Sequence, residues 1–198
     1  MALPATDTFT TGPSADLENY GAGNWTLNSG GAGAMRIVNT VDAVHSVNVD
    51  ENLYHWNADT FANDQYSEAT ASGAAGSNSF IGPAVRVHAS AATGYYYYVS
   101  SDSAYLSKLV SGSWTQLGST GSAGGNNLRR LEAEGTTITP YAAGSVDSSI
   151  GAQTDSSIAS GSAGLSGYAE DAGHRLDNWE GGNLGSGPVA RRIFVTHC

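Results

Sequence analysis

The chain has 198 residues and a mass of 20.3 kDa, a size that favours a single domain. Its formal net charge is -10, and its 8 basic residues are scattered along the chain. This balance argues against a nucleic-acid partner, which normally needs a basic stripe, and against an anionic membrane surface. Charged residues make up only 13% of the chain, so Ser, Thr, Asn and Gly must hydrate much of the surface.

The two ends of the chain carry little targeting information. No run of about 18 apolar residues occurs, so the sequence predicts no transmembrane helix. The start, MALPATDTF, lacks the basic and apolar regions of a secretory signal, and we expect synthesis in the cytoplasm. Cys198 is the only cysteine, which excludes a disulfide within the chain. We interpret it as an exposed thiol, with a bond between chains as the alternative.

The first half of the chain predicts short strands separated by turns. The 26 glycines favour tight turns over long helices. We expect a loose arm over residues 1–6, which the first strand follows. Strands are expected at Asp7–Thr10, Trp25–Leu27, Met35–Val38, Thr40–Asn52 and Gln65–Ser72. The aromatic-rich stretch over residues 52–64 contains Asn and Asp turn formers, and we interpret it as a loop.

The clearest pattern is a hairpin between Ile81 and Ser101, in which two runs alternate around an Ala/Thr/Gly turn. In the return run, one side carries Tyr95, Tyr97 and Val99, and the other carries Tyr96 and Tyr98. In the first run, Val85 and Val87 are expected to oppose Arg86 and His88. One face should pack on a core, and the other should be wet or face a partner.

The second half continues in the same way. Strands are expected at Ala104–Val110, Trp114–Leu117, Leu128–Glu134, Thr136–Ala142, Leu165–Ala169 and Arg175–Trp179. We interpret residues 118–127 as a flexible linker and Thr154–Ala159 as one helical turn. Roughly ten to thirteen closely spaced strands are typical of a β-sandwich or jelly roll.

The tail, residues 183–198, begins with a Gly/Ser/Pro hinge and becomes rich in strand formers. We expect an arm that adds a strand to a neighbouring copy or to its own sheet. The candidates for contacts between chains are Arg191, Arg192, Phe194 and Cys198.

Six short landmarks follow one another over residues 7–182. They are Asp7-Thr8-Phe9, Gly23-Asn24-Trp25, Asn63-Asp64-Gln65-Tyr66-Ser67, Ile81-Gly82 with Val85-Arg86, the run from Leu131 to Ile138, and the run from Leu176 to Gly182. Together they resemble the concanavalin A-like lectin/glucanase superfamily, in the laminin-G-like branch common in bacterial and phage proteins. The resemblance implies an all-β fold, a jelly roll with two antiparallel sheets face to face. Members include sugar-binding modules, glycan hydrolases and lyases, and structural modules of phage particles, and the fold does not choose among them.

The chain lacks the carboxylate pattern of the hydrolases in this superfamily. They carry Glu-x-Asp-x-x-Glu along one strand, whereas the nearest run here is Glu132-Ala133-Glu134 beside Arg129 and Arg130. We interpret this run as a solvated face with local ion pairs. The sequence also contains neither a Gly-x-Ser-x-Gly elbow nor a HExxH motif. We therefore expect no enzyme activity, with a glycan hydrolase or lyase as the least favoured alternative.

The best candidates for ligand binding are Arg86, His88, Tyr96 and Tyr98. Their strands should place them on one side, and aromatic platforms beside polar donors suit sugar recognition or a protein interface. The alternative is that the tyrosines fill the groove of a curved sheet or pack beneath a loop. We expect no cofactor, although the resemblance also implies a structural calcium ion in many members. Calcium candidates are Asp64, Asp171 and Asp177, with ordinary solubilising acids as the alternative.

Taken together, the resemblance and the composition favour a non-catalytic module on the surface of a phage virion. It would decorate the capsid or belong to the tail, would be made in the host cytoplasm, and would contact other virion proteins or copies of itself. The alternative is a lectin-like carbohydrate-binding module that acts outside the cell on cell-surface glycans.

Overall fold

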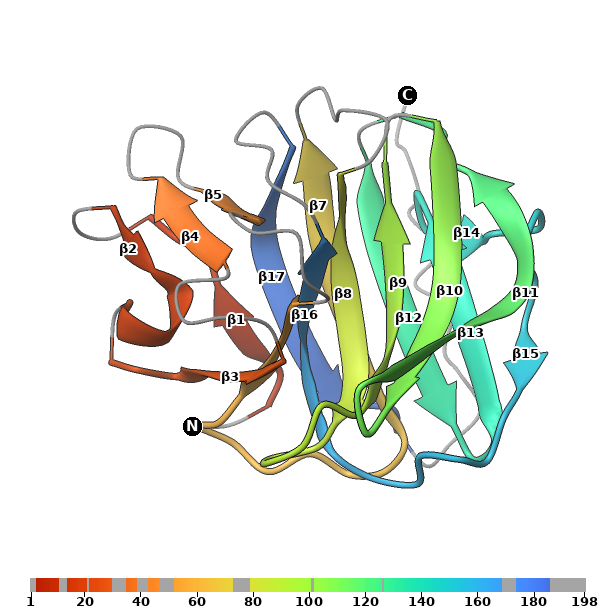
Figure 1. The fold of residues 1–198 in the computed structure, drawn as a ribbon, viewed down its shortest axis with the longest axis horizontal. Coiled ribbons are helices and arrows are strands. Elements are labelled where there is room, and N and C mark those ends of the chain that lie inside the picture. The colour runs from red at the N-terminus through yellow and green to blue at the C-terminus, as the bar shows by residue number, and fades with distance from the viewer. Residues whose placement is uncertain are drawn as a thin grey trace, which may run out of the picture.

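A computed structural model describes residues 3–10, 14–20, 22–29, 35–38, 43–46, 52–72, 79–100, 102–125, 127–168 and 174–185. They form two antiparallel sheets packed face to face (Figure 1), which confirms the all-β sandwich expected from the sequence. The described residues include one short 3-10 helix, Leu17–Asn19. Over the same residues, no helix has the length and apolar character to cross a membrane.

Over the described residues, the larger sheet has ten strands. Its order is β14-β13-β12-β7-β17-β5-β4-β2, with β1 paired to β17 and β15 paired to β13. The strands are β1 Ala5–Asp7, β2 Ala15–Asp16, β4 Met35–Val38, β5 Ala43–Ser46, β7 Gln65–Ser72, β12 Leu128–Glu134, β13 Thr137–Ala142, β14 Ser145–Val146, β15 Gln153–Thr154 and β17 Arg175–Asn183. β1 begins at Ala5, inside the expected arm, because Ala5 pairs with Gly181 of β17.

In the same part of the chain, the second sheet has seven strands in the order β11-β10-β9-β8-β16-β6-β3. The strands are β3 Trp25–Ser29, β6 Asn52–Trp56, β8 Phe80–Val87, β9 Gly94–Val99, β10 Ser103–Val110, β11 Ser113–Ser122 and β16 Ser162–Tyr168. The expected hairpin is β8 and β9, and it lies in the middle of this sheet. The predicted tail contacts Arg191, Arg192, Phe194 and Cys198 lie outside the described residues.

Three local predictions are wrong, each for a physical reason. The stretch interpreted as a loop contains β6, whose five residues are all buried, so it shows no alternation of polar and apolar positions. The expected linker contains the end of β11, an exposed edge strand that needs few apolar residues. The expected helical turn is absent because the carboxylate of Asp155 accepts the backbone N–H of Ser157, which holds a local turn in place of a helix.

The core between the sheets has an aromatic centre. Trp25 of β3, Trp56 of β6 and Trp179 of β17 pack with ring centroids 4.7 to 5.3 Å apart. Each indole N–H is satisfied: Trp25 donates to Asp7, Trp56 to Asp59, and Trp179 to the hydroxyl of Ser67. Burying these rings therefore leaves no indole donor without a partner, and the cluster joins both sheets.

Two buried tyrosines of β9 bind the connection that follows β14 and hold it against the core. Tyr97 donates to the carboxylate of Asp147 and accepts from Arg129, each at 2.9 Å. Tyr95 donates to Asp155 at 2.6 Å, and Lys108 donates to the same carboxylate at 2.6 Å. These bonds join residues 147–155, which follow β14 of the ten-stranded sheet, to β9 and β10 of the seven-stranded sheet.

Candidate functional site

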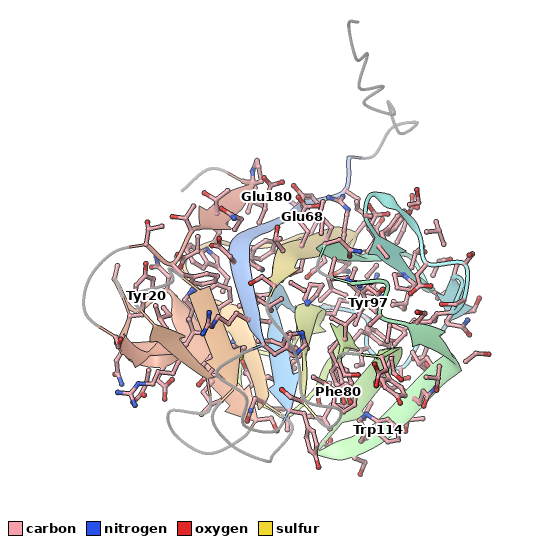
Figure 2. All side chains as sticks on the ribbon, turned by 90° about the horizontal axis from the view of Figure 1, so that it is seen from above. Tyr20, Glu68, Phe80, Tyr97, Trp114 and Glu180 are labelled. Atoms are coloured by element: carbon pink, nitrogen blue, oxygen red, sulfur yellow. The ribbon has the colours of Figure 1, made fainter. Side chains whose placement is uncertain are left out.

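The candidate site is the side of the seven-stranded sheet that faces away from the ten-stranded sheet, which we call the uncharged face. Figure 2 shows Phe80 and Trp114 on this side, Tyr97 between the sheets, and Glu68 and Glu180 on the opposite side of the molecule. None of the seven strands contains an Asp or a Glu. The seven strands contain two strong cations, Lys108 and Arg86, and both point away from this face. Lys108 donates to Asp155, and Arg86 donates to backbone carbonyls.

One half of the uncharged face is an aromatic patch made of Phe80, Tyr96, Tyr98, Tyr105 and Trp114. The rings of Tyr96 and Tyr98 stack at 5.0 Å, and Phe80 lies 5.0 Å from Tyr98 and 5.3 Å from Tyr105. Tyr96 and Tyr98 are only 1% and 4% exposed, whereas Trp114 is 47% exposed. The accessible aromatic surface therefore belongs to Trp114, and in part to Phe80 and Tyr105, which are half-buried.

The other half is a polar corner made of Thr26, Asn28, His55, Asn57 and the backbone of His88. Thr26 lies directly opposite His55 in the pairing of β3 with β6. The side-chain amide of Asn57 donates to the hydroxyl of Thr26 at 2.7 Å. Asn28 donates to the carbonyl of His88, which follows β8. Amide and hydroxyl groups from three separate segments therefore converge at one end of the sheet.

The bonds of Asn28 determine the proton position on His55. Because the Nδ2 of Asn28 donates to a carbonyl, its Oδ1 must accept, so the Nδ1 of His55, 2.6 Å away, carries the proton. Burial lowers the pKa of His55, and the nearby His88 lowers it further. The imidazole is therefore neutral near pH 7, and its Nε2 remains an acceptor for a hydroxyl.

The expectation that Arg86 shares a side with Tyr96 and Tyr98 is wrong, because a β-bulge changes the alternation in β8. Two residues of β8, Val85 and Arg86, lie opposite one residue of β16, Ala163. Arg86 has φ 50°, a left-handed conformation that costs of order 1–3 kcal/mol in a non-glycine residue. Consequently Val87 joins the cluster of Tyr96 and Tyr98, while Arg86 points away from it and is 2% exposed.

The structure also shows where the other predicted site residues lie, which are His88, Tyr96 and Tyr98. The side chain of His88 is exposed, and its Nδ1 accepts the backbone N–H of Ser90. The structure thus brings Tyr96 and Tyr98 together and puts the backbone of His88 in the polar corner. A ligand-binding role for these residues stays a prediction.

The calcium candidates do not come together. Asp64 precedes Gln65, which lies opposite Asn183, whereas Asp177 lies opposite Thr70. Five residues along a strand correspond to about 17 Å. Asp171 lies outside the described residues. In the part of the chain that the structure describes, no group of three or more His, Cys, Asp or Glu side chains could hold a metal ion. The expectation of no cofactor, with structural calcium as the alternative, stays a prediction.

Sequence reasoning did not single out Thr26, Asn28, His55 and Asn57. A signal was present, because Thr26 and Asn28 alternate with the core residues Trp25 and Leu27, and His55 alternates with Tyr54 and Trp56. It could only be used once β6 was known to be a strand, since its pairing with β3 brings these side chains together.

Comparisons with known proteins show the fold. No model of a protein family matches the chain, and no curated protein sequence matches it. The carbohydrate-binding module CBM66 from Bacillus subtilis is similar in structure, with TM-score 0.54, 16% identity, 81% of this chain covered and 92% of that one. A Bacillus subtilis protein of unknown function with a galectin-like fold has TM-score 0.59, 9% identity, and covers 90% and 94% of the two chains.

A Bacillus licheniformis β-glucanase is also similar, with TM-score 0.53, 12% identity, 88% of this chain covered and 99% of that one. At such identities the likeness concerns the fold alone. It shows that this chain has the antiparallel two-sheet sandwich of the galectin-like and concanavalin A-like jelly rolls, as the sequence landmarks implied. The neighbours include both a binding module and an enzyme, so function has to be argued from the residues of this chain.

Proposed function

We propose that this chain is a non-catalytic, lectin-like module that binds a neutral glycan on the uncharged face. The observation that carries the proposal is the composition of this face: amides, hydroxyls and a neutral imidazole at one end, and an exposed indole at the other. Hydroxyl groups of a sugar can bond to the polar corner, and the C–H side of a sugar ring can pack on Trp114. One similar solved structure, CBM66, is a carbohydrate-binding module by name, which supports the same ligand class.

The dimensions of the face suit an extended ligand. Trp114 lies on the edge strand β11, and Thr26 lies on the opposite edge strand β3. Six strand spacings of about 4.8 Å separate these edges, which is roughly 29 Å across the sheet. The side chains between the two ends, such as Leu53, Val87 and Tyr96, are at most 1% exposed, so a glycan of several units would contact the ends of the face rather than its middle.

The absence of Asp and Glu from the seven strands supports a binding role over a catalytic one. A glycoside hydrolase of the usual kind needs two carboxylates on either side of the scissile bond. A glycan that lies on this sheet would meet no such pair within its strands. The lack of strong charge also favours neutral over acidic or basic glycans, because an uncharged face provides no partner that would offset the desolvation of a charged group.

The test is a glycan array with the full chain, followed by calorimetry with the neutral glycan that binds. Trp114→Ala and Asn28→Ala should each weaken binding by at least about tenfold, the loss expected for a stacking platform or a well-placed hydrogen-bonding group. The matched control is Glu68→Gln, on the opposite side of the molecule, which should bind like the wild type. The same glycan should show no increase in reducing ends during incubation.

Three results would contradict the proposal. The first is an array on which no neutral glycan binds. The second is an equal loss of binding in Trp114→Ala and in Glu68→Gln. The third is release of reducing ends from the bound glycan, which would make the chain an enzyme.

A second candidate function is that of a structural module on the surface of a phage virion, and one observation favours assembly. The edge strand β11 has ten residues, none of them charged, and most are exposed. Natural proteins usually protect such edges with charges or proline, because an open edge can pair with another chain. Native mass spectrometry showing a stable oligomer that Gln116→Lys and Thr120→Lys disrupt would support this candidate, and a monomer at all concentrations would contradict it.

A further inference from the structure

A hollow of about 770 Å³ lies at one end of the sandwich, on the side to which the bulge in β8 turns Arg86. Four segments form its walls: residues 62–64 before β7, residues 135–136 between β12 and β13, residues 156–159, and residues 183–185 at the end of β17. Arg86 lines the hollow but is only 2% exposed. The hollow is therefore built from segments that are distant in the sequence and meet around one buried cation.

Arg86 holds three of these four segments. Its guanidinium donates to the carbonyls of Asn63, Ile158 and Gly135 at 2.9, 3.0 and 2.8 Å. Its backbone N–H donates to the buried side chain of Gln65 at 3.1 Å, which holds the bulge itself. A sandwich could close this end with apolar side chains. Here a strained backbone and a buried cation shape a hollow instead. Such features cluster at functional sites.

Two polar side chains near Arg86, those of Asp64 and Asn183, are each held by a hydrogen bond through one atom, and a second polar atom of each is available to a ligand. Asp64 accepts the backbone N–H of Gly135 through Oδ1 at 2.8 Å, and the same oxygen lies 3.7 Å from Nη2 of Arg86. Asn183 accepts the backbone N–H of Ala62 through Oδ1 at 2.7 Å. Among the described residues, neither Oδ2 of Asp64 nor Nδ2 of Asn183 makes a further hydrogen bond. The hollow therefore presents one charged acceptor and one amide donor, both held in place.

The remaining lining defines the class of ligand. Thr136 and Ser156 add two exposed hydroxyls, and Ile158 and Leu184 add apolar surface. The charges of Arg86 and Asp64 balance each other. An anion would meet the carboxylate of Asp64 in a chain of net charge -10, and a cation would meet Arg86. A neutral molecule with adjacent hydroxyls fits best, because one hydroxyl can donate to Asp64 while its neighbour accepts from Asn183.

We propose that this hollow is a second binding site, distinct from the uncharged face, and that it takes a single unit of a neutral sugar. No aromatic residue lines it among the described residues. The sugar is therefore held by hydrogen bonds at its edge rather than by stacking. The hollow takes one sugar unit, whereas the uncharged face takes a longer glycan, and neither function requires the other.

The experiment titrates the full chain with methyl glycosides of neutral hexoses and pentoses, and follows backbone amide signals by NMR. Gly135, Ala159 and Leu184 should shift with at least one sugar. Asp64→Asn keeps an oxygen for the N–H of Gly135 but removes the charged acceptor. Asn183→Asp keeps the oxygen for Ala62 but replaces the donor. Each should weaken binding by at least about tenfold.

Asp102→Asn, an exposed acid outside the hollow, is the matched control for charge and should bind like the wild type. Trp114→Ala should also retain this binding, which separates failure of this site from failure of the uncharged face. Equal thermal unfolding midpoints for the variants establish that the fold persists. The inference is overturned if no neutral glycoside shifts these amides, if Asp64→Asn and Asn183→Asp bind normally, or if a uronate binds more tightly than its neutral counterpart.

Discussion

The outward sides of the two sheets differ in a way that explains much of the molecule. The ten-stranded sheet presents a charged face made of Tyr66, Glu68, Arg130, Glu132 and Glu180. There Arg130 donates to Glu68 at 3.0 Å and to Glu132 at 2.7 Å, and its guanidinium lies 3.6 Å from the ring centroid of Tyr66. Among the residues that the structure describes, the uncharged face of the seven-stranded sheet has no such ion pair, and its central side chains are buried.

The difference shows which side is adapted to water. Ion pairs that are partly exposed contribute little to stability, but they keep a sheet soluble and discourage partners. Apolar and aromatic residues on an outward side act as a second core. In β8 and β9 nearly every residue is buried, whereas in β7 buried and half-buried residues alternate strictly. The uncharged face is therefore the side on which a partner or ligand is expected.

The sharpest test of this comparison replaces one tyrosine on each side. Tyr98→Ala should lower the free energy of unfolding by about 3–5 kcal/mol, as for a core aromatic residue, because Tyr98 packs among Phe80, Tyr96 and Tyr105. Tyr66→Ala should cost less, about 1–2 kcal/mol, since this half-buried residue loses the cation–π contact with Arg130 and the hydrogen bond from its hydroxyl to Glu180. Urea unfolding measures both. Equal costs would mean that the two outward sides are not different in kind.

The difference between wet and buried sides also explains which strands could be predicted from the sequence. β7 and β12 were predicted with their observed bounds, because one side of each is wet and the residues alternate. β6 was missed because both of its sides are buried, and the end of β11 was missed because an exposed edge can consist of Gly, Ser and Thr. Alternation carries information only where the two sides of a strand differ.

The candidate sites were harder to predict because they depend on pairing and on backbone irregularity. Asn28 and His55 are 27 positions apart and meet only through the pairing of β3 with β6. Arg86 leaves its expected side because of one extra residue in β8, and Gly161 allows this, since a Cβ there would lie 2.4 Å from the carbonyl carbon of Arg86. Neither feature has a local sequence pattern. Asp64 and Arg86 were assigned to different sites, yet they line the same hollow.

A second prediction concerns the ion pairs of the charged face. Glu68→Gln should lower the free energy of unfolding by up to about 1 kcal/mol at low salt, because it removes one of the two carboxylates bound to Arg130. The loss should shrink as salt rises, since screening weakens the wild-type pair. Unfolding of both proteins over a salt series provides the measurement. Trp114→Ala serves as the control, since its effect on stability should not vary with salt, and a salt-independent Glu68→Gln would contradict the prediction.

The smallest expected effect is a pH dependence specific to the uncharged face. The pKa of His55 in the folded chain is lowered by burial and by His88, so the unfolded chain binds a proton first as the pH falls. Stability should therefore be full above about pH 6.5, the ordinary pKa of histidine, and should decline below it until the folded chain is also protonated. Protonation also removes the acceptor at Nε2, so glycan binding should weaken over the same range. NMR titration of the imidazole, with His55→Gln as the variant, distinguishes this group from His88. Two results would contradict this prediction: a pKa of His55 at or above the ordinary value, or an unchanged pH profile in His55→Gln. Either would mean that a neutral His55 imidazole is not the acceptor for a hydroxyl ligand in the polar corner.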